Sequence, residues 1–149
     1  MDIEKAFSIS ASALDAQKAR LDVISGNLAN MESTRTPEGG PYRRKDVIFT
    51  ATPVEGSFEK ALTVQTGNGR PSDPLGVEVT KIISDNRPFK KVFEPQHPDA
   101  DPEGYVLYPN VNTMEEMVNM ISALRSYEAN ATALNATKNM AMKALEIGR

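Results

Sequence analysis

Two segments with helical periodicity lie at opposite ends of the 149-residue chain. In the first, which covers about residues 3–31, apolar side chains recur every seven residues, with partner positions three or four residues away. This heptad pattern is typical of a helix that packs along another helix. Because a helix of this length is marginal alone in water, the segment is expected to need a partner. Its predicted packing residues are Phe7, Leu14, Leu21, Ile24 and Leu28.

The second helical segment is predicted over about residues 113–147. Asn112 or Thr113 can cap its start, and Glu115 or Glu116, three residues on, can complete a capping box. The run would be roughly 50 Å long at the α-helical rise, a length that soluble helices rarely reach without a long partner. One face carries its predicted packing residues, which are Met117, Ile121, Leu124, Leu134 and Leu145.

Between the helical ends, about residues 32–112 indicate short strands in turn-rich sequence. The stretch of about residues 50–76 has little pattern and is predicted to be flexible. We therefore predict an α+β fold, in which the two ends pack as an antiparallel coiled coil and the central segment is small, β-rich and partly irregular. The predicted helical domain combines residues 3–31 with residues 113–147, and residues 32–112 form the outer segment.

The composition excludes several classes of function. The formal net charge is -3, without the basic excess that nucleic-acid binding normally needs. The absence of cysteine removes disulfides, thiolate zinc sites and thiol nucleophiles, and the one histidine cannot supply a multi-histidine metal site. No apolar run approaches the roughly 18 residues that span a bilayer. The N-terminal residues lack the pattern of a secretion signal, so we expect no signal cleavage. We expect no nucleic-acid partner and no direct membrane insertion, and any export would use a route without signal cleavage.

The single histidine lies in an acidic, proline-containing segment. As a catalytic base His97 would need a nucleophile, and no recognisable nucleophile motif occurs. Asp99, Asp101 and Gly104 have the spacing that opens a calcium-binding loop, but its twelfth position is Asn110 rather than a bidentate glutamate. A tight turn is the favoured interpretation. We predict no catalytic residue, metal or cofactor. A small hydrolase or metal-binding protein that uses His97, Asp99 and Asp101 is the weaker alternative.

Basic and amide side chains give two further hypotheses. Arg43, Arg44 and Lys45 form the densest basic feature, and such charges in a strand commonly form a solvated face or guard a sheet edge. We treat these three residues as candidate outer contacts for a partner. Asparagines on the predicted helices are either exposed or fix the register between helices by hydrogen bonds, as a buried asparagine does in coiled coils. The sequence favours neither interpretation.

The two ends together resemble a known family. Residues 16–31, AQKARLDVISGNLANM, are similar to the N-terminal signature of bacterial flagellar rod and hook proteins, and residues 109–130 are similar to the family's C-terminal block. The middle motifs, at 39–43 and 99–106, and the short length indicate a rod subunit. The residues that match the family motif are Asn27, Leu28, Asn30, Asn110, Asn112, Glu116, Met117, Arg125, Tyr127 and Asn130.

The resemblance implies a structural function in the proximal rod of the flagellar basal body. Proteins of this family pass through the flagellar type III export apparatus without signal cleavage and join the rod, the drive shaft that crosses the periplasm and transmits torque. Their terminal helices pack as the inner layer of a tube. The implied partners are copies of the same chain, other flagellar rod proteins, the rod and ring components of the basal body and the export apparatus. From the residues alone, a cytoplasmic coiled-coil scaffold or adaptor is the alternative.

Overall fold

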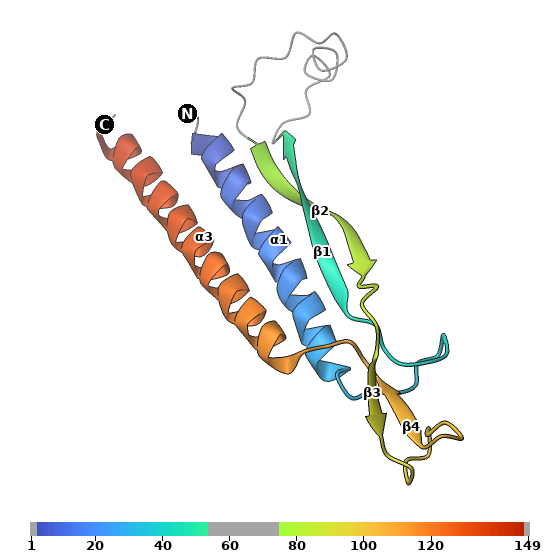
Figure 1. The fold of residues 1–149 in the computed structure, drawn as a ribbon. Helices are drawn as coiled ribbons and strands as arrows, with labels where there is room; N and C mark the ends of the chain where they lie inside the picture. The colour runs from blue at the N-terminus through green and yellow to red at the C-terminus, as the bar shows by residue number, and fades with distance from the viewer. Residues whose placement is uncertain (1–2, 54–74, 148–149) are drawn as a thin grey trace, which may run out of the picture. The chain divides into compact units, whose positions relative to one another are not determined.

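A computed structural model describes residues 3–53 and 75–147 of the chain (Figure 1). Helix α1 covers Ile3–Ala29, and helix α3 covers Thr113–Ile147. The strands are β1 (Lys45–Pro53), β2 (Leu75–Ser84), β3 (Lys90–Phe93) and β4 (Tyr105–Tyr108). Two long terminal helices with small strands between them confirm the predicted α+β fold. Among the described residues, neither helix is both long enough and apolar enough to cross a bilayer.

The helix ends follow from local capping. Asn112 is the N-cap of α3, because its side-chain Oδ1 accepts a hydrogen bond from the backbone N–H of Met114 at 3.1 Å. Its carbonyl accepts the first helical bond, from the N–H of Glu116, at 3.0 Å. The side chain of Glu116 takes no part in this cap. At the end of α1, the carbonyl of Gly26 accepts a hydrogen bond from the backbone N–H of Asn30 at 3.2 Å and a second one from the Asn30 side chain at 2.9 Å, so Asn30 closes the last turn of the helix.

The strands form two separate two-stranded sheets. One pairs β1 with β2, and the other pairs β3 with β4 in antiparallel register, with Val92 opposite Val106 and Phe93 opposite Tyr105. Val106 is buried and Val92 opposite it is half-buried, whereas Phe93 and Leu107, on the other face of this small hairpin, are exposed. Of the stretch predicted to be flexible, residues 54–74 lie outside the described residues.

The chain divides into two compact units. The first comprises Met1–Lys18, Phe49–Thr80 and Arg125–Arg149, and the second comprises Ala19–Ile48 and Lys81–Leu124. Each unit therefore contains a part of both helices. The predicted division into a rod-core part and an outer part concerns the assembled protein and stays a prediction.

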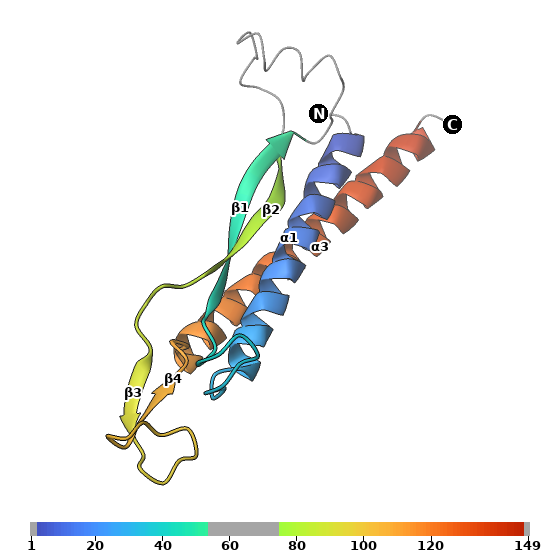
Figure 2. The ribbon, with the colours of Figure 1, turned by 90° about the vertical axis from the view of Figure 1, so that its right-hand side faces the viewer.

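In the first unit, strand β2 lies against α1. The backbone N–H of Val77 donates to the Ser12 side chain at 3.1 Å, and Figure 2 shows both strands of this sheet beside the helix. Ala16 and Thr137 are buried here, on α1 and α3 respectively. The small side chain of Ala16 suits close contact between elements.

In the second unit, polar side chains are buried beside the apolar ones. Ile24, Val106 and Ala123 are buried, and so are Asn27, Arg44 and Glu116. The end of α1 lies beside the start of α3, because the Asn27 side chain donates to a Glu116 carboxylate oxygen at 2.9 Å. Charged side chains are almost never fully buried unless they are paired. The hydrogen bonds and ion pairs of these buried polar side chains are therefore central to how the unit is held together.

Candidate functional site

A buried ion pair lies at the centre of the second unit. The Arg44 Nε donates to Glu116 Oε1 at 2.8 Å, and the exposed fractions of the two side chains are 9% and 0%. Asn27 Nδ2 donates to the other carboxylate oxygen, Oε2, at 2.9 Å. Desolvation makes such a pair costly unless further hydrogen bonds satisfy its remaining atoms, and here both carboxylate oxygens accept a hydrogen bond. We call Asn27, Arg44, Asn110 and Glu116 the polar cluster.

Asn27 uses all of its hydrogen-bonding capacity. Its Oδ1 accepts from the Tyr42 hydroxyl at 3.0 Å and from the backbone N–H of Lys45 at 2.9 Å. Its Nδ2 donates to the carbonyl of Lys45 at 2.8 Å as well as to Glu116. An asparagine amide offers two donors and an acceptor oxygen with two lone pairs, so all four positions are occupied. This one side chain joins the end of α1 to the start of β1 and to the first turn of α3.

Asn110 likewise joins several segments by side-chain hydrogen bonds, here the segments that flank the strands. Its Oδ1 accepts from the backbone N–H of Arg44 at 2.9 Å, and its Nδ2 lies 3.2 Å from the carbonyls of both Asp85 and Arg87. The carbonyl of Arg44 in turn accepts from the N–H of Asp85 at 2.8 Å. The residue before β1, the segment after β2 and the segment after β4 are thereby held together.

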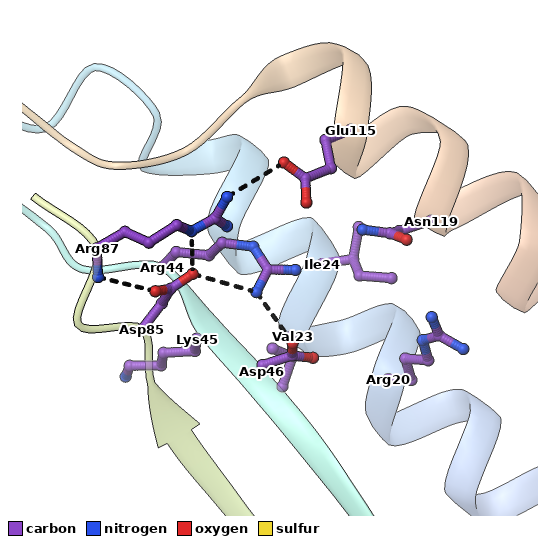
Figure 3. Close-up of a pocket in the computed structure, with 10 residues that line it drawn as sticks. All are labelled: Arg20, Val23, Ile24, Arg44, Lys45, Asp46, Asp85, Arg87, Glu115 and Asn119. Atoms are coloured by element: carbon purple, nitrogen blue, oxygen red, sulfur yellow. Dashed lines mark hydrogen bonds and ion pairs between the residues drawn. The ribbon is translucent and has the colours of Figure 1, made fainter. Parts of the chain in front are cut away.

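A charged rim surrounds a cleft of about 300 Å³ next to the cluster (Figure 3). Arg44 Nη1 lies 3.0 Å from Asp46 Oδ2 and 3.8 Å from Asp85 Oδ2. Arg87 donates to Asp85 at 2.7 Å and lies 3.5 Å from a Glu115 carboxylate oxygen. Because Arg87 and Glu115 are about half exposed, solvent screens their pairing, which contributes little to stability.

The charges shift several pKa values. Burial raises the pKa of Tyr42, and the nearby Glu116 carboxylate raises it further. Burial alone would lower the pKa of Arg44, but hydrogen bonds to Asp46 and Glu116 outweigh it and raise the pKa. The backbone N–H of Arg87 lowers the pKa of Asp85 against the opposing effect of burial, and the Arg87 and Arg44 guanidinium groups lower it further. All of these groups keep their usual charge at neutral pH.

The structure brings together three of the predicted motif residues, Asn27, Asn110 and Glu116. Asn112 and Asn30 cap the two helices instead. Of the other motif residues, Leu28 is half-buried, Met117, Arg125 and Tyr127 are exposed, and Asn130 donates to the carbonyl of Ser126 in its own helix. The Asn27 side chain therefore bonds from α1 to α3, as the register hypothesis expected, whereas Asn30 and Asn130 each donate to the carbonyl four residues earlier in the chain.

Arg44 differs from the expected outer contact. It is buried because its guanidinium neutralises the Glu116 carboxylate inside the unit. Arg43 and Lys45 are exposed, and the Arg43 guanidinium lies 4.4 Å from the centroid of the Phe89 ring. The pairing of Arg44 with Glu116 was missed because the two residues are 72 positions apart and no local signal connects them.

The predicted packing residues of the two helices differ in how far they are buried. On α1, Ile24 is buried and Phe7, Leu14, Leu21 and Leu28 are half-buried; on α3, Leu134 is half-buried and Leu145 is exposed. In the second unit, α3 carries an exposed apolar stripe with helical spacing, and its exposed fractions are 71% for Met114, 50% for Met117, 64% for Val118, 52% for Ile121 and 44% for Leu124. Met114 and Val118 extend the stripe beyond the residues that the sequence pattern identified.

The loop around His97 forms a turn. His97 Nδ1 accepts a hydrogen bond from the backbone N–H of Asp99 at 3.1 Å, and an Asp99 carboxylate oxygen accepts from the Thr34 hydroxyl at 2.8 Å. Gly104 has a φ of 82°, a conformation that favours glycine. Within residues 3–53 and 75–147, no group of three or more histidine, aspartate or glutamate side chains is placed to hold a metal ion.

Two protein-family models match the ends of the chain. Residues 7–35 match the flagella basal body rod protein family, and residues 103–147 match the C-terminal part of the flagellar basal body rod FlgEFG proteins. Similar proteins named flagellar basal-body rod protein FlgC occur in several bacteria. The one from Bacillus subtilis is 50% identical over 147 residues, which cover 95% of each chain. The one from Yersinia enterocolitica is 43% identical over 149 residues and covers both chains completely.

The chain belongs to the FlgC family of flagellar basal-body rod proteins. This agrees with the resemblance of the two ends and the middle motifs. Three residues of the polar cluster, Asn27, Asn110 and Glu116, lie within the two family matches, whereas Arg44 lies between them. The FlgC relatives match across nearly their whole length, so the central segment belongs to the likeness as well.

Proposed function

We propose that the chain is a structural, non-enzymatic subunit of the proximal rod of the flagellar basal body, and that it polymerises through its terminal helices into the shaft that transmits torque. Family membership supports a structural subunit of the rod, located in the basal body and associated with other rod components. The single observation that carries the assembly mode is the exposed apolar stripe of α3, Met114, Met117, Val118, Ile121 and Leu124.

The apolar stripe differs in chemistry from the buried face of α3. In the second unit the buried positions of α3 are Glu116 and Ala123, one of them charged and the other small. The buried carboxylate of Glu116 has its partners in the polar cluster, while the large apolar side chains of the stripe remain in contact with water. Exposed apolar patches of this kind mark protein–protein interaction sites.

The hydrophobic free energy gained when a neighbouring subunit covers the stripe can be estimated. Full burial of a methionine, valine, leucine or isoleucine side chain contributes about 1.5–3 kcal/mol. Since these five are already about half covered, a neighbour that buries the remainder gains roughly 1 kcal/mol from each. Repetition of a contact between two different surfaces of identical subunits builds a closed ring or, when the rotation does not close, an open helical assembly, and the second is the geometry of a rod.

The partners and the export route belong to the same proposal. The terminal helices would contact copies of the chain and other rod proteins, the chain would reach the periplasm through the flagellar type III export apparatus without cleavage, and the rod and ring components of the basal body would surround it. Small buried cores and long helices suit export in a partly folded state, because the helices gain much of their stability only on assembly.

The substitution Ile121→Asp tests this function. A carboxylate in the middle of the stripe would have to be desolvated at the contact, so we expect the variant to be absent from detergent- and salt-washed basal bodies and its cells to be non-motile. Asn135→Asp is the matched control, because it adds the same charge at an exposed polar position of the same helix.

Mass-spectrometric quantification of the chain relative to ring proteins is the readout. Retention of the wild type and of Asn135→Asp with loss of Ile121→Asp supports the proposal. Normal amounts of Ile121→Asp in washed basal bodies would contradict the helix-mediated assembly. Absence of the wild-type chain from the basal bodies of flagellated cells would contradict the rod assignment and favour the cytoplasmic scaffold.

A further inference from the structure

A groove of about 510 Å³ lies in the second unit, beside the start of β1. Its lining comes from the loop after α1, the start of β1, the end of β2 and the residue before β3. The side chains that give the groove its rings and its positive charge are Pro37, Pro41, Tyr42, Arg43, Lys45 and Phe89. We call this the Tyr42 groove.

The groove combines aromatic rings with positive charge. The Arg43 guanidinium lies 4.4 Å from the Phe89 ring centroid, and the Lys45 ammonium lies 5.9 Å from the Tyr42 ring centroid. Glu38 is the acidic residue among those described at its lining. A surface of this chemistry fits a segment that carries carboxylates together with compact apolar groups, because the cations attract the former and the rings pack against the latter.

The connection between β3 and β4 is such a segment. Residues 94–104, which we call the acidic proline loop, read EPQHPDADPEG and include Glu94, Asp99, Asp101 and Glu103 as well as Pro95, Pro98 and Pro102. Asp101 and Glu103 are exposed, and the Glu103 side chain is 77% exposed although its carboxylate lies 3.9 Å from the Lys91 ammonium, a solvent-screened pair that contributes little. The loop therefore presents both carboxylates and proline rings to solvent.

The loop is ordered before it meets any partner. The backbone N–H of Glu94 donates to the carbonyl of Gly104 at 2.9 Å, and the N–H of Asp101 donates to the carbonyl of Tyr105 at 2.8 Å. The Thr34 hydroxyl donates to an Asp99 carboxylate oxygen at 2.8 Å and ties the loop to its own chain. A preordered loop loses little conformational entropy when it binds.

The loop of the same chain does not line the groove. The described lining residues lie between 30 and 45, with Ser84 and Phe89, and none belongs to residues 94–104. We propose that the Tyr42 groove of one copy receives the acidic proline loop of a second copy of this chain. This inference rests on the proposed function, in which several copies lie side by side in the rod.

The contact is heterologous, since a groove on one copy meets a loop on the next, and it can therefore repeat from subunit to subunit. Charge pairs at an exposed rim contribute little affinity individually. Their complementarity instead selects the partner and sets its orientation. In the assembly, the apolar stripe of α3 would supply most of the binding free energy and the groove would fix which neighbour follows which.

Introduced cysteines test the contact directly, because the chain has none of its own. Two differently tagged single variants, Glu38→Cys at the groove and Asp101→Cys in the loop, are expressed together as the only source of the chain. Basal bodies are purified, oxidised and analysed on a non-reducing gel. We expect a disulfide-linked heterodimer that carries both tags. The matched control replaces the loop cysteine by Glu128→Cys, an exposed acidic position on α3, and should give none.

Exchange of the charges supplies a second test. The double substitution Arg43→Glu with Lys45→Glu, and separately Asp101→Lys with Glu103→Lys, should each lower the amount of the chain in basal bodies severalfold. The combination of all four should restore it, because the signs are then exchanged but still complementary.

The outcomes separate this inference from the proposed function. If both cysteine variants are retained in basal bodies at wild-type amounts and no heterodimer forms, the groove contact is wrong while the rod assignment stands. Failure of the four-residue exchange to restore retention also contradicts the contact. If the wild-type chain itself is missing from basal bodies, the proposed function fails.

Discussion

Replacement of Glu116 by glutamine tests whether the polar cluster holds the second unit together. The carboxylate accepts from Arg44 Nε at 2.8 Å through one oxygen and from Asn27 Nδ2 at 2.9 Å through the other. A glutamine of the same shape has only one acceptor oxygen. In either orientation of the amide, its NH₂ group therefore faces a donor of Arg44 or of Asn27, and the ion pair is lost.

The magnitude follows from the geometry. Removal of one partner of a buried ion pair typically costs about 3–5 kcal/mol, because the other charge stays buried without compensation. Arg44 keeps Asp46 at 3.0 Å and Asp85 at 3.8 Å, so the cost should lie at the lower end. We expect Glu116→Gln to lower the free energy of unfolding by about 3 kcal/mol. This is a large share of the roughly 5–15 kcal/mol that stabilises an ordinary domain.

Urea unfolding followed by circular dichroism measures the effect. With a slope of about 1.5 kcal/mol per molar urea, the midpoint should fall by about 2 M. Glu115→Gln is the matched control. Glu115 is the neighbouring residue, is about half exposed and pairs with Arg87 only at 3.5 Å, so its loss should cost less than about 1 kcal/mol. A Glu116→Gln variant as stable as the Glu115→Gln variant would refute the reasoning.

Three further predictions concern single positions. Asn27→Ala leaves four hydrogen-bonding groups without their partner and should cost about 3 kcal/mol in the same urea assay; a loss below about 1 kcal/mol would contradict its part in the cluster. Gly104→Ala forces a Cβ to within 2.9 Å of Phe93 Cε2 at a φ of 82°, and should lower the melting temperature by several degrees; an unchanged melting temperature would show that the turn relaxes freely. Because the pKa of Asp85 is lowered in the folded chain, its stabilisation is present at neutral pH and is lost as the pH falls through the folded-state pKa. Asp85→Asn should therefore be less stable than the wild type at neutral pH, the difference should shrink as the pH falls through the folded-state pKa of Asp85, and a difference that stays constant as the solution is acidified would contradict the shift.

Much of the fold could be predicted from sequence periodicity. The helical pattern predicted helices over 3–31 and 113–147, close to the observed Ile3–Ala29 and Thr113–Ile147. Periodicity could not predict which face of each helix packs inside the chain and which face stays exposed. A heptad pattern indicates that an apolar face needs a partner, but it does not distinguish a partner in the same chain from one in a neighbouring subunit. On α3, for example, the apolar side chain of Ile121 is exposed in the single chain, whereas the charged side chain of Glu116 is buried.

The site was predictable only in part. Asn27, Asn110 and Glu116 could be singled out because they match a family motif, whereas the sequence did not decide whether a helix asparagine such as Asn27 is exposed or bonds to a neighbouring helix. Their convergence on Arg44 had no signal in the sequence, because the ion pair joins residues 72 positions apart. Arg44 also looked like its neighbours Arg43 and Lys45, and only the fold separates the one buried basic side chain from the two exposed ones.

The central claim is that α3 leaves its apolar stripe exposed in the single chain and buries it on assembly. Thiol labelling of an Ile121→Cys variant tests this claim most directly, since the chain has no other cysteine. A water-soluble maleimide is applied to the purified monomer and to washed basal bodies, with Asn135→Cys as an exposed polar reference on the same helix. The account predicts rapid labelling of position 121 in the monomer and strong protection in the basal body. Equal labelling of position 121 in both states, with the variant fully incorporated, would contradict it.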